Sequence, residues 1–446
     1  MMLYDRIKGN KRIPFHMPGH KRNTRLLGKQ LPYEIDITEI EGFDNLHSPD
    51  GIIREIEEKA QRIYQSEHSF LLINGSTVGI LAAVSTVLKR GDTVLIARNC
   101  HKSVYNAIDL VGARAKYLSC HPDEYSIPTP VDINELKLQI SKHNPKMIIV
   151  TSPTYEGVCS DTEKICEIAH SVNIPVMIDA AHGAHDIGLT KNADIVVMSL
   201  HKTLPALTQC AVAHINGDLV NAEEYRIKLS VFETSSPSYV LLCSIDNCLT
   251  FLEQITEEHN FLNEFYKNRI SLYDNLFDMK NLKAVQYDDY TKLIIFTGYS
   301  NISGIELSSL LRNNYSIEPE MAAEDYIVLF TTMCDDYKNY KILEKALKTI
   351  DNDLEERDYI PKKFLPIPER FCSVDKVGDC SFQELSDSVD CVCGEYIWAY
   401  PPGIPLIVPG ERISRELIEY IKTAYKDGIS LQSSYRKIPE KIYCQL

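Results

Sequence analysis

The sequence lacks any apolar run that approaches the roughly 18 to 20 residues needed to span a membrane. It also lacks an excess of positive charge, because 47 lysines and arginines stand against 62 aspartates and glutamates. The formal net charge of −15 argues against nucleic-acid and anionic-membrane partners, since both need a basic face. The first residues contain no apolar core of a signal peptide. We therefore expect a cytoplasmic protein with neither kind of partner.

Low-complexity segments, internal repeats and a regular cysteine framework are also absent. The thirteen cysteines are scattered, and Cys210, Cys243 and Cys248 lie in apolar runs, where a thiol packs as a small hydrophobe. This usage indicates reduced thiols in a cytoplasmic protein. His182 and His185 lie close together, but no further ligands with metal-site spacing follow them. We therefore expect no metal in the functional site.

The first half of the chain has the pattern of an α/β domain. Short apolar runs alternate with amphipathic stretches, which predicts a largely parallel sheet covered by helices. The predicted strands are residues 70–73, 93–97, 147–150, 176–179, 195–199 and 211–215. The predicted helices are residues 77–89, 101–111 and 162–172. Ligands of such sheets bind beyond the carboxyl ends of the strands, so the residues just past these strands are the first candidates for a site.

The second half predicts further, smaller domains. Helical patterns at 246–279 and 337–357 bracket strand-like runs, which indicates a small α/β domain. Pro361–Pro368 is a plausible linker, and the prolines of Tyr400–Glu411 favour an extended loop over a regular strand. A helix is expected over 414–427. The predicted domains are an N-terminal segment 1–30, a large domain 31–255, a small domain 256–360 and a C-terminal domain 361–446.

Polar residues follow three of the predicted strands. Asn74-Gly75-Ser76-Thr77 opens a helix, where free backbone N–H groups and hydroxyls can bind a phosphate, although an ordinary N-cap has the same composition. Asp179 ends a strand, and a carboxylate there can keep a pyridinium nitrogen protonated, cap a helix or form a buried ion pair. Lys202 follows the next strand, and burial beside His201 would favour its neutral, imine-forming amine. Alone, Lys202 is a surface lysine; together, the three features predict a Schiff base with pyridoxal 5′-phosphate (PLP).

The order of these features resembles the aspartate-aminotransferase superfamily of PLP enzymes, and more closely the ornithine/lysine/arginine decarboxylase family. The resemblance covers nearly the whole chain and rests on specific motifs. They are Phe15-His-Met-Pro-Gly-His-Lys21, Asp36-Ile-Thr-Glu39, Gly42-Phe-Asp-Asn-Leu-His47, Asn99-Cys-His-Lys-Ser103, Ser152-Pro-Thr-Tyr-Glu-Gly157, Ser199-Leu-His-Lys202, Tyr400-Pro-Pro-Gly403 and Pro409-Gly-Glu411.

The resemblance implies a fold and a set of roles. The fold is an aspartate-aminotransferase-type large domain with a mainly parallel sheet, a small α/β domain and a C-terminal α+β domain. Lys202 would carry PLP, Asp179 would pair with the pyridine nitrogen, His101 would stack on the ring, and His182 would lie near its other side. The phosphate would be bound by Gly75, Ser76, Thr77, Ser199 and His201.

The resemblance also implies decarboxylation of lysine, arginine or ornithine, small cationic amino acids. It further implies a homodimer, or a higher even oligomer, with a shared active site; the Ser235–Ser238 turn would reach the partner's phosphate or serve as a plain N-cap. The chain resembles the family's short form, without the N-terminal wing domain. Glu395 and His20 are candidate substrate residues, although a surface role for Glu395 fits equally.

The C-terminal motif departs from the family pattern, because an arginine and a proline expected before Tyr400 are missing. Two alternatives therefore stay open. One is another PLP reaction at Cα, such as transamination, with Arg412 gripping the substrate carboxylate. The other is a catalytically silent PLP-binding homologue. The sequence does not choose among the three amino acids, since each needs an acidic group at a distance set by its chain length.

Overall fold

The computed structural model describes residues 2–14, 17–257, 260–359, 365–400, 403–426 and 428–445. Several parts of the predictions above fall outside these ranges: Phe15 and His16 of the first motif, residues 258 and 259 of the helical stretch 246–279, residues 361–364 of the predicted linker, Pro401 and Pro402, and residue 427 of the predicted helix 414–427. The chain divides into two compact units. Unit 1 comprises Met1–Val87 and Thr162–Leu262, and unit 2 comprises Leu88–Asp161 and Asn263–Leu446.

The strands that the structure describes in unit 1 run in the order β1 (His68–Leu72), β7 (Ala211–Ile215), β6 (Ile195–Met198) and β5 (Val176–Asp179). Strands β5 and β6 are parallel, whereas β7 is antiparallel to both β6 and β1. Every residue of β5, β6 and β7 is buried, which is why their sequences are unbroken apolar runs rather than alternating ones. The strands predicted here are confirmed with shifted ends: β1 covers residues 68–72 rather than 70–73, and Ser199 lies just past β6.

The helices of unit 1 are α1 (Leu3–Gly9), α2 (Thr24–Leu27), α3 (Ile52–Tyr64), α4 (Gly75–Val87), α7 (Thr162–His170), α8 (Leu200–Thr203), α9 (Ala222–Phe232) and α10 (Tyr239–Glu257). Helix α4 lies against the sheet through Gly79, where an added Cβ would come within 2.7 Å of Leu72 Cδ1 and 2.9 Å of Val197 Cγ1. The absence of a side chain at Gly79 therefore sets how closely α4 approaches the strands.

Unit 2 contributes three parallel strands, β2 (Thr93–Ala97), β3 (Arg114–Leu118) and β4 (Met147–Thr151), together with helices α5 (Lys102–Val111) and α6 (Ile133–His143). The strand order of the seven-stranded sheet is β1-β7-β6-β5-β4-β2-β3, of which the first four belong to unit 1. The predicted largely parallel α/β sheet is thus confirmed. Strand β3 was not predicted, because exposed Arg114 and Lys116 alternate with its buried residues.

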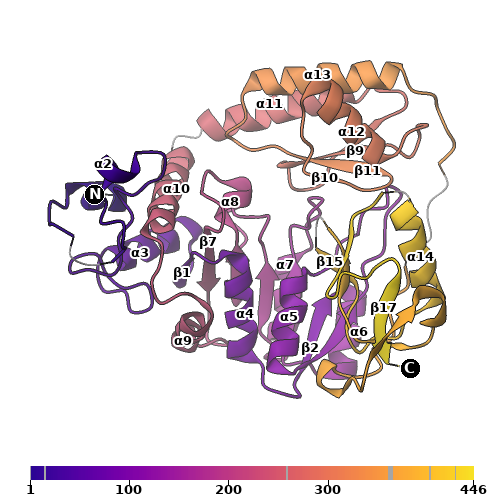
Figure 1. Ribbon diagram of the computed structural model, residues 1–446, viewed down its shortest axis with the longest axis horizontal. Coiled ribbons are helices and arrows are strands. Elements are labelled where there is room, and N and C mark those ends of the chain that lie inside the picture. Colours follow the sequence, from indigo (N-terminus) through magenta and orange to yellow (C-terminus); the bar gives the residue numbers. More distant parts are fainter. Residues whose placement is uncertain are drawn as a thin grey trace. The chain divides into compact units, whose positions relative to one another are not determined.

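A second sheet in unit 2 has the order β10 (Met321–Ala322), β11 (Tyr326–Phe330), β9 (Lys292–Phe296) and β8 (Lys283–Val285), all antiparallel. Helices α11 (Asn260–Leu276), α12 (Gly304–Tyr315) and α13 (Tyr337–Asn352) pack on one face of it (Figure 1). Alternate strand residues face opposite sides, so Leu293 and Ile295 join the helices while Ile294 and Phe296 join a second core with Val158. Both faces are buried, as expected for such apolar strands. Within the predicted helical stretch 246–279 the structure describes α10 and α11, and residues 258 and 259 lie outside the described residues.

The C-terminal part of unit 2 holds two three-stranded sheets and helix α14 (Arg415–Lys426). One sheet is β12 (Ser381–Glu384), β17 (Lys441–Gln445) and β13 (Val392–Cys393); the other is β15 (Ile404–Ile407), β14 (Ile397–Ala399) and β16 (Leu431–Ser433). The expectation of a loop throughout Tyr400–Glu411 is wrong, because β15 lies inside it. Strand β15 is an edge strand of its sheet, and its Pro405 is paired with Trp398 of β14. Proline is tolerated at such a position because the free side of an edge strand has no neighbouring strand that needs an N–H donor.

Among the helices that the structure describes, none is long and apolar enough to cross a membrane. The described residues also contain no cluster of three or more histidine, cysteine or acidic side chains that could hold a metal ion. Cys210, Cys243 and Cys248 are buried, as their apolar surroundings predicted.

Candidate active site

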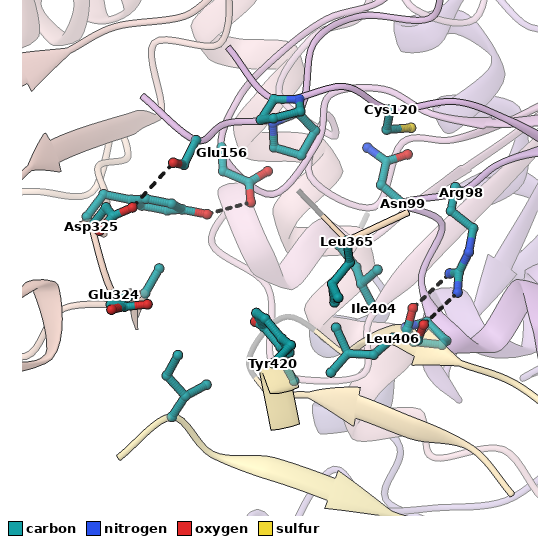
Figure 2. A pocket seen from close by; sticks show the side chains of 18 of the residues that line it. Arg98, Asn99, Cys120, Glu156, Glu324, Asp325, Leu365, Ile404, Leu406 and Tyr420 are labelled. Atoms are coloured by element: carbon teal, nitrogen blue, oxygen red, sulfur yellow. Dashed lines mark hydrogen bonds between the residues drawn. The ribbon is translucent and has the colours of Figure 1, made fainter. Parts of the chain in front are cut away.

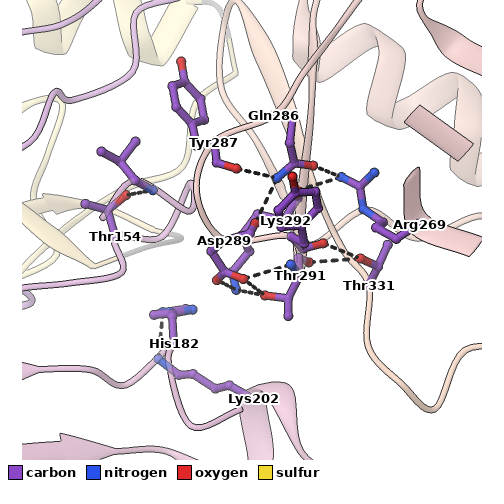
Figure 3. Close-up of polar contacts among 12 residues, drawn as sticks. Thr154, His182, Lys202, Arg269, Gln286, Tyr287, Asp289, Thr291, Lys292 and Thr331 are labelled. Atoms are coloured by element: carbon purple, nitrogen blue, oxygen red, sulfur yellow. Dashed lines mark hydrogen bonds and ion pairs between the residues drawn. The ribbon is translucent and has the colours of Figure 1, made fainter. Parts of the chain in front are cut away.

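Lys202 and His182 lie together in unit 1, just past the carboxyl ends of two parallel strands. Lys202 belongs to α8, a four-residue helix directly after β6, and His182 lies three residues after the end of β5. The Lys202 Nζ and His182 Nε2 atoms are 3.0 Å apart (Figure 3). The parallel pairing of β5 and β6 brings these two strand ends side by side, which is why residues twenty positions apart meet.

Asp179 is the last residue of β5 and is 2% exposed. Burial raises the pKa of its carboxyl, and the Lys202 ammonium and the N–H of Ala181 oppose that rise. The Ala181 N–H is 3.2 Å from Asp179 Oδ1. A buried carboxylate with so few donors is well suited to a cationic partner, such as a protonated ring nitrogen.

The turn Asn74-Gly75-Ser76-Thr77 leads from β1 directly into α4, which begins at Gly75. Gly75 has a positive φ of 77°, a conformation that costs other residues free energy, and its N–H donates to Gln209 O at 2.9 Å. The N–H groups of the first turn of α4 have no partner within the helix, so Ser76 and Thr77 lie where an anion is favoured. The predicted helix start at Thr77 is two residues too late.

Ser199 and His201 lie on either side of Leu200 at the beginning of α8. Ser199 is completely buried, and its Oγ has no hydrogen-bond partner among the described residues; the same holds for the buried Oγ1 of Thr203. Burial lowers the pKa of His201, whose Nδ1 lies 3.0 Å from Cys210 O. Buried hydroxyls without partners are uncommon in folded proteins, so these atoms fit a ligand that supplies acceptors, as a phosphate would.

The residues of unit 1 therefore fit PLP: an amine, a buried carboxylate, hydroxyls without a partner among the described residues and a helix N-terminus lie at or just past the ends of β1, β5 and β6. Asp179 ends β5 and His182 follows it; Ser199, His201 and Lys202 follow β6, and the turn 74–77 follows β1. His20, the candidate substrate residue of unit 1, bonds instead to Asp36, with Nε2 3.0 Å from Oδ2.

His101 belongs to unit 2, where it caps α5. Its Nδ1 accepts from the Ser103 N–H at 3.2 Å and lies 2.8 Å from Ser103 Oγ. A Cβ added to Gly403 would lie 3.1 Å from His101 Nε2, and the Lys102 N–H donates to Gly403 O at 3.1 Å. Two motifs about 300 residues apart in the sequence, at His101 and Tyr400–Gly403, are thus in contact.

Comparison with known proteins assigns the chain to a family. The profile described as "Orn/Lys/Arg decarboxylase, major domain" matches residues 3–292, and "Orn/Lys/Arg decarboxylase, C-terminal domain" matches residues 375–429. The chain belongs to the Orn/Lys/Arg decarboxylase family. It is 33% identical to the uncharacterized protein YaaO of Bacillus subtilis over 460 residues, covering 96% of this chain and 94% of that protein. It is 30% identical to a Bacillus subtilis arginine decarboxylase, covering 94% of this chain and 92% of that protein.

Solved structures of decarboxylases share the fold. The Francisella novicida lysine decarboxylase LdcF superposes with a TM-score of 0.83 at 16% identity, covering 99% of this chain and 80% of that one. The constitutive lysine decarboxylase of Escherichia coli superposes with a TM-score of 0.80 at 16% identity, covering 100% of this chain and 81% of that one. A Bacillus subtilis ureidoglycine–glyoxylate aminotransferase superposes with a TM-score of 0.56 at 14% identity, covering 67% of this chain and 84% of that one. These similarities confirm the predicted aminotransferase-like fold.

The family motif Pro409-Gly-Glu411 has a structural role in this decarboxylase-family chain. Glu411 is completely buried; it accepts from Tyr117 OH at 2.6 Å and lies 3.5 Å from the Arg98 guanidinium. Arg98 in turn donates to Pro405 O at 2.7 Å and to Leu406 O at 3.0 Å. The motif thus ties the C-terminal strands to the residue that follows β2.

The structure bears on two expectations for the C-terminal part, the surface position of Glu395 and the binding of a substrate carboxylate by Arg412. Glu395 is 1% exposed, so the alternative of a surface glutamate is wrong; its carboxylate accepts from the Tyr443 N–H at 2.7 Å and the Tyr435 N–H at 3.3 Å. Arg412 donates to Asp390 O at 2.7 Å and lies 3.4 Å from the Glu369 carboxylate. The Arg412 guanidinium thus interacts with other residues of the C-terminal part. Glu395 therefore holds two backbone segments together, and a role in substrate binding stays a prediction.

Unit 2 also contains a cavity of about 320 Å³, and Lys202 is not among its lining residues (Figure 2). Its walls are mostly apolar, with Leu365, Ile404 and Tyr420 labelled in the figure. Glu156, from the Ser152–Gly157 motif, is buried there and accepts from Tyr326 OH at 3.3 Å. Burial raises the pKa of Glu156, which favours its neutral form.

Sequence reasoning missed one residue beside the turn 74–77. Glu233 directly follows α9 and is 6% exposed, and its Oε1 accepts from the Ile73 N–H at 2.8 Å. A glutamate after an amphipathic helix normally faces water, so no sequence signal distinguishes it.

Proposed function

We propose that this protein is a PLP-dependent decarboxylase that converts a basic amino acid, lysine, arginine or ornithine, into the corresponding amine and CO2. The observation that carries the proposal is the grouping of Lys202, His182 and Asp179 past the ends of β5 and β6. Membership of the decarboxylase family supports the reaction class.

In this proposal each residue of unit 1 has a defined task. Lys202 would hold the cofactor covalently through Nζ, and Asp179 would face the ring nitrogen. Gly75, Ser76, Thr77, Ser199 and His201 would bind the phosphate, with the hydroxyl of Ser199 gaining the partner that it lacks among the described residues. His101 would stack on the ring. When bound, PLP supplies an electron sink that stabilises the negative charge left on Cα as a bond breaks.

The protein would orient the substrate and manage its protons. The 3.0 Å separation of Lys202 Nζ and His182 Nε2 lets this pair share a proton, and Cα needs one after CO2 has left. The buried Asp179 carboxylate would keep the ring nitrogen protonated, and a desolvated site strengthens that interaction. The substrate's cationic end needs an acidic group; Glu395 and His20 remain the candidates from the sequence.

The relatives point to a first substrate and an assembly. Four relatives at 28–30% identity are named arginine decarboxylases, so arginine is the first amino acid to test. We further propose a homodimer, or a larger even assembly, with an active site shared between subunits. The Ser235–Ser238 segment, directly before α10, would then reach the partner's phosphate.

The test is CO2 release from arginine, lysine and ornithine, each assayed separately with the PLP-loaded protein. We expect release from one or more of them and complete loss in Lys202→Ala. Lys191→Ala is the control, because Lys191 is an exposed lysine of the same unit and should not matter. Cofactor absorbance without CO2 from any substrate would replace this proposal with other PLP chemistry or a silent homologue. Full activity in Lys202→Ala would refute the mechanism.

A further inference from the structure

Glu233 links helix α9 to the turn that we assign to the cofactor phosphate. Its Oε1 accepts from the buried N–H of Ile73, the residue between β1 and that turn, at 2.8 Å. The backbone N–H of Asn74 also interacts favourably with the carboxylate. One side chain therefore restrains two consecutive peptide units directly before Gly75, where α4 begins.

The surroundings of Glu233 are unusual for a carboxylate. It is 6% exposed, and the interactions that act on its carboxylate among the described residues are backbone hydrogen bonds and not ion pairs. The titratable groups around it are few: Tyr225 of α9 faces it, and its hydroxyl donates to Gly79 O of α4 at 3.1 Å. From the segment before α3, His47 Nε2 lies 2.9 Å from the carbonyl oxygen of Thr234, the next residue. Within the part of the chain that the structure describes, no cation compensates for the burial of this acid.

We propose that Glu233 is a positioning residue for the cofactor: it fixes the Ile73–Thr77 backbone so that the first N–H groups of α4 are arranged for the phosphate before PLP binds. This inference rests on the proposed function, since it takes the turn as the phosphate site. An arranged set of donors binds more tightly than one that must be ordered during binding. Without an acceptor, the buried N–H of Ile73 would lose its partner, and the turn would relax to find another.

The same geometry predicts that cofactor affinity depends on pH. Burial raises the pKa of Glu233 to about 7, and the two backbone N–H groups oppose the rise. A phosphate bound at the adjacent turn is negative, so it disfavours the carboxylate and favours the neutral acid. Phosphate binding should therefore be accompanied by proton uptake at Glu233, and affinity should fall as the pH rises through about 7.

The experiment compares Glu233→Ala and Glu233→Gln with the wild-type protein by calorimetric titration of the apo protein with PLP, between pH 6 and 8.5. Pyridoxal, which has the same ring and aldehyde but no phosphate, is the second probe. Glu224→Ala and Glu224→Gln are matched controls, because Glu224 is an exposed glutamate of α9, the helix that Glu233 follows.

For Glu233→Ala we expect the Kd for PLP to rise about tenfold, which corresponds to about 1.4 kcal/mol, while the Kd for pyridoxal stays unchanged. Glu233→Gln keeps an acceptor without the charge, so it should match the wild type at pH 6 and bind PLP several-fold more tightly than the wild type at pH 8.5. The Glu224 variants should behave as wild type throughout.

An unchanged Kd for PLP in Glu233→Ala, or an equal loss for PLP and pyridoxal, would overturn the positioning role. If Glu233→Ala fails to fold, the Glu233→Gln pH profile decides: a profile parallel to that of the wild type contradicts the inference. Failure of the proposed function looks different, because the wild-type protein itself would then bind no PLP and Ser76→Ala would change nothing.

Discussion

Replacement of Gly79 by alanine tests how closely α4 must approach the sheet of unit 1. An added Cβ would lie 2.7 Å from Leu72 Cδ1, 2.9 Å from Val197 Cγ1 and 3.2 Å from the hydroxyl of Tyr225. All three neighbours are completely buried, and the Tyr225 hydroxyl already donates to Gly79 O at 3.1 Å. Because two of these distances are below 3.0 Å, either these buried side chains or α4 itself must shift.

Two opposing effects set the magnitude. Overpacking by one methyl group in a filled core costs typically about 1–3 kcal/mol. Alanine regains about 1 kcal/mol relative to glycine in a helix. We therefore expect Gly79→Ala to reduce the free energy of unfolding by roughly 1 kcal/mol, with an upper limit of about 2 kcal/mol. Because Gly75, which begins α4 and belongs to the proposed phosphate turn, lies one helical turn before Gly79, the shift should also weaken PLP binding.

Chemical unfolding followed by circular dichroism measures the stability, and PLP titration measures the binding. Gly9→Ala is the control: Gly9 ends α1 with no atom within 4 Å of an added Cβ, so it should be neutral or stabilising. A Gly79→Ala protein as stable as Gly9→Ala, with unchanged PLP affinity, would show that the close approach of α4 is not required.

Two further predictions concern buried titratable groups. Burial lowers the pKa of His214 from 6.5 to about 3, so the unfolded chain binds the proton first and stability falls as the pH drops below 6.5. His214→Gln should reduce the slope of the free energy of unfolding against pH by up to about 1.4 kcal/mol per pH unit. Urea unfolding between pH 7 and 5 measures this slope, and an unchanged slope would contradict the prediction. Lys292, completely buried and 2.9 Å from Asp289, forms an ion pair in unit 2 (Figure 3). Lys292→Met should reduce the free energy of unfolding by about 3–5 kcal/mol, because it leaves the Asp289 charge buried without a partner. The double variant Lys292→Met/Asp289→Asn removes that charge, so thermal unfolding should show a clearly smaller loss. Equal losses in the two variants would argue against an uncompensated charge as the cause.

The strands that carry the candidate site were predictable because they are buried on both faces. β5 and β6 read as continuous apolar runs that end in polar residues, and β2 was predicted to the residue. β3 was not predicted because exposed Arg114 and Lys116 alternate with its buried residues, and β15 was expected to be a loop because of the several prolines in residues 400–411. Sequence patterns report burial well, but they do not report whether a strand is an edge strand.

The reactive side chains of the candidate site could be selected from the sequence, but the buried carboxylates that hold the surrounding backbone in place could not. Lys202, Asp179 and His182 stand out because reactive groups at strand ends meet in parallel sheets. Glu233, Glu395 and Glu411 are buried carboxylates that hold backbone or a guanidinium, and nothing local marks them as buried. Their burial depends on which distant segment covers them. The roles of the site residues remain predictions.

The most direct test of the account is to find which residue holds the cofactor. The protein is loaded with PLP, reduced with borohydride to make the attachment permanent, digested and analysed by mass spectrometry. The account predicts the pyridoxyl mass on Lys202 alone, in the peptide that contains Ser199-Leu-His201. Label on a different lysine, or none at all, would contradict it.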